Sequence, residues 1–348
     1  MKFGMQFFPC VGPEIKPADK YFEECLSLVG CADELGYSHV RIVEHYFHAY
    51  GGYSPNPMLF LAAASQKTKK ARLVTGAILP VFNNPLKLAG EIGMLDAISS
   101  GRLDVGFARA FMPHEFARFG VSLDESKGRF SEGIEQIKGL LKTEDFSSNG
   151  EFHKFPPTTS YPRPTQRPHP PFYIAAFATP QSFQEAGKSG YAIMAIPLSG
   201  GKMSELIGLY REAWKSAGHK GNGTVMLAFH MFCWPDEREA IDLSQSRINN
   251  YLKTLVNAGS DWLNQASSDY PGYRQLIKDL AKESFESQLE KGAAWVGTPS
   301  QICDQIKSYK DQVGDFDIAS LQVNFFDMPL HLARKSITLF SEEVISKF

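Results

Sequence analysis

The sequence predicts one α/β domain over residues 1–348, built as a (β/α)8 (TIM) barrel with insertions. Eight short apolar runs recur along the chain, and each is usually followed by an amphipathic helical pattern. Alternation of this kind forms parallel sheets, and eight units in about 350 residues favour a closed barrel over a doubly wound sheet. The G-x-G-x-x-G, P-loop and G-x-S-x-G motifs are absent, which makes Rossmann, P-loop and α/β-hydrolase folds poor fits.

The first half of the chain supplies four strands with helices between them. Pro9 and Pro80 end strands, Gly36 and Gly101 end helices, and Pro85 suits a helix start. The expected strands are 2–8, 39–43, 72–79 and 102–108, and the expected helices are 20–36, 58–68, 85–100 and 126–141.

The second half resumes the alternation after a Pro- and Ser-rich stretch at 144–171. Because strands and helices continue at once, this stretch is an irregular excursion rather than a domain linker. Residues 257–292 are polar, aromatic and poorly periodic, which indicates an insertion with the character of a mobile lid. The expected strands are 172–176, 191–196, 224–234 and 318–324, and the expected helices are 180–188, 203–217, 236–256, 298–311 and 330–348.

Composition narrows the class of protein. Apolar residues make up 43% and charged residues 21%, which is typical of a globular chain. A formal charge of −2 gives no electrostatic reason to expect a nucleic acid or an anionic membrane as partner. No run reaches the ~18 apolar residues of a spanning helix. Five cysteines without a C-x-x-C pair predict reduced thiols in a cytoplasmic protein.

The strongest chemical signal follows the strand at 39–43. Glu44, His45, Tyr46, Phe47 and His48 come directly after it, although a buried strand needs none of these groups. Chemistry in barrels lies at the carboxyl ends of the strands. We expect His45 to act as an acid, a base or a hydrogen-bond donor. His48, like His39 on the strand itself, is expected to have a structural role.

A metal site built from Glu44, His45 and His48 is the competing interpretation. No second cluster of carboxylates or histidines is placed at another strand end, and His114-Glu115 is followed by Arg118, which misses H-E-x-x-H. The expectation is therefore no metal.

An anion site is predicted at two neighbouring strand ends. Thr179 precedes Pro180 at a helix start, and Gln181 and Ser182 lie in the first turn, where backbone N–H groups are unpaired. Arg109, at the end of the strand before, can contact the same phosphate. Separately, Thr179 could be only an N-cap and Arg109 only a structural ion pair; together they favour a ligand that bears a phosphate.

Small residues at the strand ends would let a flat ring approach the backbone, although routine barrel packing explains them equally well. A dry pocket also needs apolar walls. The small residues are Gly76, Ala77, Ala108 and Ala178, and the candidate walls are Phe8, Phe47, Phe111, Met112 and Phe177.

Together these residues resemble the bacterial luciferase-like flavin monooxygenases over nearly the whole chain, with a pattern most like that of the luciferase α chain. Each motif is weak alone, but their order and spacing are specific. The motifs are Met1–Gly4, Glu44-His45 with Phe47, Thr75–Ile78 before Pro80, Gly101-Arg102 through Gly106 to Arg109, and Val296–Pro299 before the late helix.

The resemblance implies a barrel that binds reduced FMN, takes O2 and forms a flavin C4a-hydroperoxide. It implies that His45 is the catalytic histidine. It also implies a separate NAD(P)H:flavin reductase, and a homodimer or a heterodimer with a paralogous chain. The implied cofactor contacts are Gly76, Ala77, Ala108, Arg109, Phe177, Ala178, Thr179, Gln181 and Ser182, and the implied substrate contacts are Phe8, Glu44, Tyr46, Phe111 and Met112.

Three departures from luciferase bear on the substrate. Tyr46 stands where luciferase has a second histidine, Ala108 where it has a reactive cysteine, and Phe177 where it has a glutamate. They argue against light emission and a long-chain aldehyde, and leave a small apolar substrate such as an aldehyde, a ketone or a secondary-metabolite intermediate. The alternatives are a non-catalytic flavin-binding subunit, a deazaflavin-dependent oxidoreductase and a metal-dependent barrel hydrolase.

Overall fold

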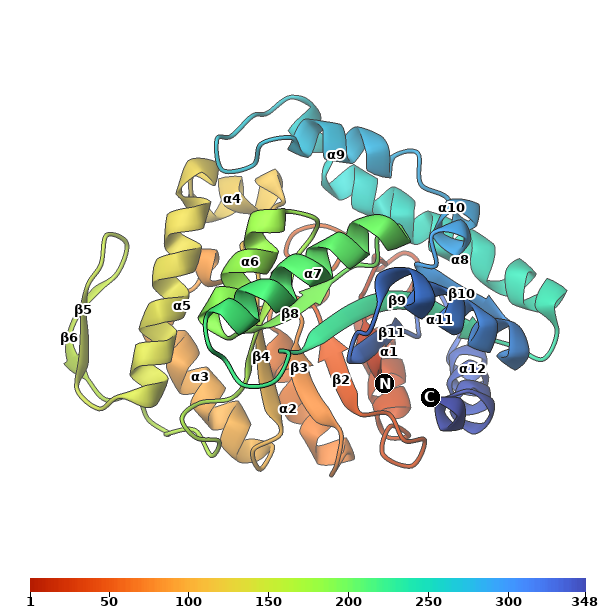
Figure 1. Ribbon diagram of the computed structural model, residues 1–348, viewed down its shortest axis with the longest axis horizontal. Helices are drawn as coiled ribbons and strands as arrows, with labels where there is room; N and C mark the ends of the chain where they lie inside the picture. The colour runs from red at the N-terminus through yellow and green to blue at the C-terminus, as the bar shows by residue number, and fades with distance from the viewer.

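The computed structural model describes residues 1–348 and contains a closed barrel of parallel strands, seen near the centre of Figure 1. The last barrel strand pairs with the first, so the barrel leaves no open edge. The predicted (β/α)8 barrel is therefore confirmed. In order around the barrel the strands are β1 (Lys2–Phe7), β2 (His39–Ile42), β3 (Arg72–Thr75), β4 (Leu103–Phe107), β7 (Phe172–Ala176), β8 (Ala192–Ala195), β9 (Val225–Cys233) and β11 (Ile318–Gln322).

Helices surround the barrel and begin where the sequence offers caps. Asn56 and Asn84 accept backbone N–H groups at the starts of two helices, each with proline at the next position. Thr298 and Gln301 form a capping box. The main helices are α1 (Ala18–Val29), α2 (Pro57–Lys67), α3 (Pro85–Ile98), α4 (Pro113–Phe119), α5 (Ser126–Lys142), α6 (Pro180–Ser189), α7 (Gly200–Ser216), α8 (Glu237–Ala258), α11 (Pro299–Val313) and α12 (Leu330–Glu343).

Side chains alternate between the two faces of each strand, which separates the barrel interior from the layer under the helices. On β1, Phe3 packs 5.2 Å from the Phe340 ring of α12, and Phe7 packs 5.6 Å from the Phe60 ring of α2. Gln6, which alternates with these positions, therefore points into the barrel, where its side chain bonds to Arg41. A separate interior cluster contains Val74, Ala77, Tyr173, Met194 and Met226.

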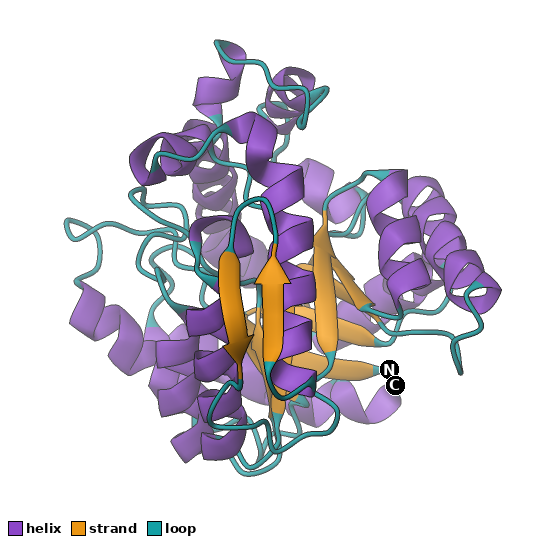
Figure 2. Ribbon diagram, turned by 90° about the vertical axis from the view of Figure 1, so that its left-hand side faces the viewer, coloured by secondary structure: helices purple, strands orange, loops and turns teal.

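The stretch 144–171 is less irregular than predicted. It contains an antiparallel hairpin of β5 (Phe146–Asn149) and β6 (Lys154–Thr158), which stands in the foreground of Figure 2. Two prolines inside β6 hid the strand, because proline removes ladder donors and is tolerated only where pairing is incomplete.

Residues 257–292, which the sequence predicts to be an insertion, contain short helical segments for which no bounds were predicted. They form a 3-10 turn (Ser260–Leu263), α9 (Tyr273–Leu280) and α10 (Phe285–Glu290). Trp262, Tyr270, Ile277 and Phe285 are buried. These side chains pack against neighbouring loops and helices instead of forming a long periodic face, which is why periodicity missed them.

A ninth strand, β10 (Ala294–Gly297), was not predicted. It pairs with His230–Cys233, while the earlier part of β9, Val225–Leu227, pairs with β8. β9 is therefore long enough to pair with β8 in the barrel through its first residues and with β10 through its last residues. The chain ends lie side by side (Figures 1 and 2), and the Met1 ammonium donates to the Phe348 carbonyl at 3.2 Å. None of the helices is both long and apolar enough to cross a membrane.

Candidate active site

His45 lies after the end of β2 and is held by a glutamate from α4. Its Nδ1 is 3.0 Å from Oε1 of Glu115, and the same oxygen accepts the Tyr46 backbone N–H at 2.9 Å. Glu115 is fully buried, so the carboxylate is fixed in one position. Because this oxygen already acts as an acceptor for the Tyr46 N–H, we assign the proton of the His45–Glu115 hydrogen bond to Nδ1. The Nε2 of His45 makes no hydrogen bond to the protein and is left for a ligand.

Aromatic rings surround the His45 imidazole. The Phe8 ring centre lies 5.7 Å away, that of Tyr50 5.2 Å away and that of Phe111 6.1 Å away. Met112 is buried in the cluster that also contains Phe8 and Tyr50. Of the predicted substrate contacts, Phe8, Phe111 and Met112 thus gather around His45.

Glu44 points to the neighbouring strand loop rather than to His45. One of its oxygens accepts the Tyr46 hydroxyl at 2.6 Å and the Asn83 amide at 3.2 Å, and the other accepts the Leu79 backbone N–H at 3.3 Å. Burial raises the pKa of the Glu44 carboxyl from its ordinary value to about 7. Glu44 therefore braces the loops after β2 and β3.

The other histidines of this region have partners within the protein. His39 lies between the Ser38 and Ser320 hydroxyls at 3.1 and 3.3 Å, and burial lowers its pKa to about 3. His48 accepts the Tyr50 backbone N–H at 3.0 Å through Nδ1. No three His, Cys, Asp or Glu side chains are arranged as a metal site, and Glu44, His45 and His48 instead bond to separate groups.

The space around Gly76 leaves no room for a side chain. A Cβ at this position would lie 2.1 Å from the Nε of Arg41. The Gly76 carbonyl accepts Nη2 of Arg41 at 3.2 Å, and the Gly76–Ala77 peptide is cis. Ala108 packs against the interior cluster that contains Ala77. The ends of β3 and β4 therefore carry only a hydrogen atom or a methyl group at Gly76, Ala77 and Ala108.

Arg109 has no carboxylate within 4.0 Å, so the structural ion pair considered from the sequence is not formed. Its guanidinium lies over the Tyr270 ring, 4.3 Å from the ring centre. The Tyr270 hydroxyl donates to the Ala110 carbonyl at 2.8 Å, and Trp262 Nε1 donates to the Phe111 carbonyl at 2.7 Å. The insertion is thus fastened to the loop after β4.

The predicted anion turn opens α6. Thr179 is its N-cap residue, but its side chain makes no capping hydrogen bond and is exposed. Ser182 N–H donates to the Thr179 carbonyl at 3.0 Å, and Gln181 donates to Glu185 at 2.8 Å. Phe177 and Ala178, which precede the turn, are half-buried. Because β4 and β7 pair, Arg109 and this turn lie at neighbouring strand ends.

Sequence reasoning missed a row of polar residues inside the barrel. The strand register aligns Arg41 with Gln6, Gln6 with Gln322, and Gln322 with His230 across β2, β1, β11 and β9. All four are buried. We call Gln6, Arg41, His230 and Gln322 the polar row. The usable signal was a large polar residue near the carboxyl end of four mostly buried strands, since buried parallel strands are usually continuous apolar runs.

Sequence reasoning also missed Glu115. His114-Glu115 was considered only as part of an incomplete zinc motif. Glu115 lies 70 residues from its partner His45, and no local pattern joins the two.

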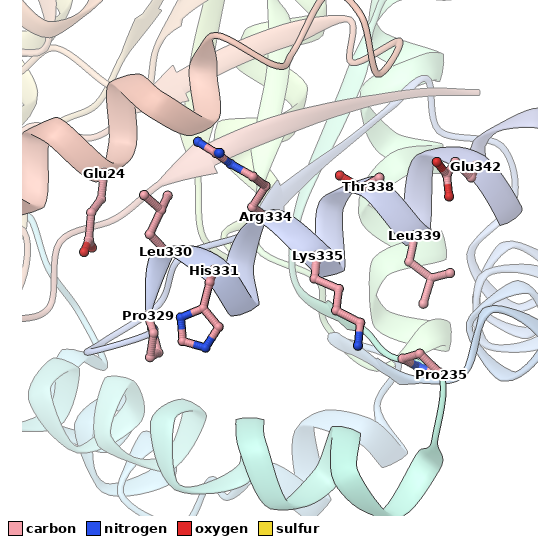
Figure 3. Close-up of a pocket in the computed structure, with 10 residues that line it drawn as sticks. All are labelled: Glu24, Pro235, Pro329, Leu330, His331, Arg334, Lys335, Thr338, Leu339 and Glu342. Atoms are coloured by element: carbon pink, nitrogen blue, oxygen red, sulfur yellow. The ribbon is translucent and has the colours of Figure 1, made fainter.

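A groove of about 710 Å³ runs along α12 (Figure 3). Its lining includes Glu24, His331, Arg334 and Lys335, and it contains none of the predicted site residues. The strand-end cluster around His45 is therefore a separate part of the molecule.

Comparison with known proteins gives consistent relatives. The family model described as luciferase-like monooxygenase matches residues 1–315. The oxygenase component of flavin-dependent trigonelline monooxygenase from Acinetobacter baylyi is 31% identical over 296 residues, which are 83% of this chain and 80% of that protein. The crystal structure of monooxygenase RslO1 from Streptomyces bottropensis is 40% identical, with a TM-score of 0.89 over 100% of this chain and 99% of that one.

The names of more distant matches mention two kinds of cofactor. The oxygenating constituent of 3,6-diketocamphane monooxygenase from Pseudomonas putida, solved with FMN, has a TM-score of 0.84 at 21% identity over 100% and 99% of the two chains, and shares the fold. An F420-dependent glucose-6-phosphate dehydrogenase from Amycolatopsis mediterranei is 26% identical over 91% of each chain. With the family model matched over most of its length and a barrel of this architecture, the chain belongs to the luciferase-like monooxygenase family.

Proposed function

We propose that the chain is the oxygenase component of a two-component monooxygenase that uses reduced FMN and O2 to oxygenate a small organic substrate. The observation that carries this proposal is the buried His45–Glu115 pair at the mouth of a barrel whose adjoining strand ends carry Gly76, Ala77 and Ala108. Membership of the luciferase-like monooxygenase family supports it.

The side chains at the ends of β3, β4 and β7 fit FMN. Gly76, Ala77 and Ala108 leave the backbone accessible to a flat ring, which larger side chains would block. Arg109 is a cation without a carboxylate partner, and the first turn of α6 is not capped by Thr179. A helix N-terminus and a nearby guanidinium are the groups that bind a phosphate. Phe177, Ala178, Gln181 and Ser182 would complete this side.

Reduced FMN, when bound, supplies the electrons that activate O2, so that one oxygen atom passes to the substrate and the other leaves as water. Glu115 fixes His45 with its proton on Nδ1, and Nε2 is then placed to accept or donate a proton at the reacting oxygen. Phe8, Phe111 and Met112 exclude water, which would otherwise release peroxide without product.

A buried histidine–glutamate pair favours an enzyme over a non-catalytic flavin-binding subunit, since an inactive subunit has no need of it.

The oxygenase assignment implies a separate flavin reductase as partner. Dimerisation through α2 and α3 is proposed from Leu59, Met94 and Ile98, large apolar side chains that are exposed on these two helices. Five free cysteines suit a cytoplasmic location.

A deazaflavin-dependent oxidoreductase is the second candidate, because an F420-dependent dehydrogenase is among the relatives. Anaerobic titration of the pure protein with reduced FMN and with reduced F420 separates the two. We expect reduced FMN to bind at least about tenfold more tightly, and O2 uptake to follow when NADH and a flavin reductase are added. Tighter binding of F420 without O2 uptake would overturn the assignment.

A further inference from the structure

We infer that the polar row is the floor of a substrate subsite that holds the anionic oxygen of a flat phenolic or enolic substrate. This inference rests on the proposed function and narrows its substrate class. The row occupies β2, β1, β11 and β9, whereas the proposed cofactor contacts lie after β3, β4 and β7. The two sets therefore divide the mouth of the barrel between them.

Arg41 is a buried cation without a counter-ion. Its guanidinium donates to the Gln6 side-chain carbonyl at 2.8 Å and to the Gly76 carbonyl at 3.2 Å, and its Nε has no partner. No carboxylate lies within 4.0 Å of it. Because buried charges in proteins are normally paired, the free energy of burying this guanidinium is offset only in part by two neutral acceptors. An anionic ligand is the partner that the site lacks.

His230 adds an uncharged hydrogen-bonding group. Of the three buried histidines, His39 bonds to two hydroxyls and His45 to Glu115, whereas neither ring nitrogen of His230 bonds to the protein. Burial lowers its pKa to about 4, so the ring stays neutral near pH 7 and presents one N–H and one lone pair. Such a ring can donate to a phenolate or enolate oxygen without adding charge.

Aromatic rings next to the row favour a flat ligand. The Tyr251 ring of α8 stands edge-on 4.7 Å from His230 and 5.5 Å from Phe8. The hydroxyls of Tyr251 and Tyr50 are 3.5 Å apart, and burial raises the pKa of both. They are therefore neutral donors beside the Arg41 cation. Phe8 and Tyr50 also contact the His45 ring, so a ring held here lies next to the proposed catalytic histidine.

The carbonyl oxygen of an apolar aldehyde can accept a hydrogen bond, but it would leave the Arg41 charge without a counter-ion. A compound with an acidic oxygen on a planar framework supplies the anion that Arg41 lacks, and its flat ring fits the aromatic surroundings next to His230. The expected small apolar substrate is thereby narrowed to a flat molecule with a phenolic or enolic oxygen.

The test uses 4-nitrophenol, at a pH where it is ionised, and 4-nitroanisole, its neutral methyl ether. Binding of each to the full-length protein is measured by calorimetry, with and without FMN. We expect the wild-type protein to prefer the phenolate by about tenfold or more, the size expected for one hydrogen bond to a charged group. Arg41→Gln should reduce this preference to about one, and His230→Phe should reduce it several-fold. His39→Asn, a buried change on the same strand as Arg41, should leave it unchanged.

A wild-type protein that binds the two compounds equally, or binds neither, overturns the inference. If Arg41→Gln does not fold by circular dichroism, His230→Phe decides alone, and an unchanged preference in that variant refutes the subsite. The affinity for reduced FMN is measured on the same samples. Loss of FMN binding with the phenolate preference intact would refute the proposed function and leave the subsite standing.

Discussion

The two halves of the barrel mouth use the same backbone frame for different purposes. After β3 and β4 the chain carries Gly76, Ala77 and Ala108, which offer volume and an accessible backbone. On β9, β11, β1 and β2 the inward positions carry the polar row, and Phe8 follows two residues after Gln6. The difference indicates a division of roles. Strand ends with small side chains make room for a flavin ring, and buried polar side chains at fixed positions determine which substrate binds beside that ring.

The boundary between the halves lies between β2 and β3, where hydrogen bonds join them. Arg41 donates to the Gly76 carbonyl, and Glu44 accepts the Leu79 backbone N–H. A substitution at this boundary should therefore affect both halves, whereas a substitution further from it should affect only one. The predictions below test this separation.

The largest effect is expected at His45, in the half that carries the polar row. His45→Ala should lower product formation by about 10²- to 10⁴-fold, the usual contribution of an acid–base group. FMN affinity should stay within about twofold, because the proposed cofactor contacts are untouched. Product and hydrogen peroxide are measured together, and peroxide should rise as product falls.

Two further variants serve as comparisons for His45→Ala, one at its partner Glu115 and one at a nearby histidine. Glu115→Gln keeps the shape of the partner but removes its charge, so product should fall by less while KM is unchanged. His48→Ala removes a histidine three residues away and should retain near wild-type yield. Unchanged product from the His45 variant would remove this residue from the mechanism.

A matched pair of alanines tests the separation directly. Ala108 follows β4, and Ala228 lies two residues before His230 on the same face of β9. Ala108→Leu should fill the space for the ring and weaken FMN binding by about tenfold or more. Ala228→Leu should leave FMN affinity unchanged and raise the KM for the organic substrate. Flavin fluorescence and steady-state kinetics measure the two effects, and equal loss of FMN binding in both variants would show that the halves do not act separately.

Much of the fold could be predicted because its signals are local. Apolar runs, proline and glycine positions and helix caps identified the eight barrel strands and the main helices except α4. His45 was also accessible, because a histidine after a buried strand is unusual in its immediate context. These features depend on neighbours within a few residues.

The missed features depend on distant residues. Gln6 and Gln322 are 316 positions apart and become neighbours only when the barrel closes, and Glu115 approaches His45 only when α4 packs over the loop after β2. Strand β10 forms because β9 extends beyond its pairing with β8, a length that the sequence of β10 does not encode. In each case tertiary pairing, rather than local propensity, decides the structure.

A substitution at the boundary should change the pH dependence of stability. The pKa of Glu44 is raised from 4.5 to about 7 by burial, so the folded chain binds this proton more tightly than the unfolded chain does. Its contribution to stability is fully present below about pH 4.5 and is lost as pH rises through about 7. Glutamine does not titrate. The free energy of unfolding of Glu44→Gln should therefore improve relative to wild type by about 2 kcal/mol between pH 5 and pH 8.

Urea unfolding at a series of pH values measures this difference. The comparison carries its own control, because Glu44 is ionised in both states above pH 8 and the difference should then be constant. Glutamine places an amide N–H₂ where Glu44 accepts the Leu79 N–H, so the absolute stability of the variant can be higher or lower than that of wild type. The direction in which the difference changes with pH is nevertheless fixed. If the unfolding free energies of wild type and variant instead change in parallel from pH 5 to pH 8, the Glu44 carboxyl is not held in its protonated form. The loops after β2 and β3 would then be joined by hydrogen bonds to an ionised carboxylate.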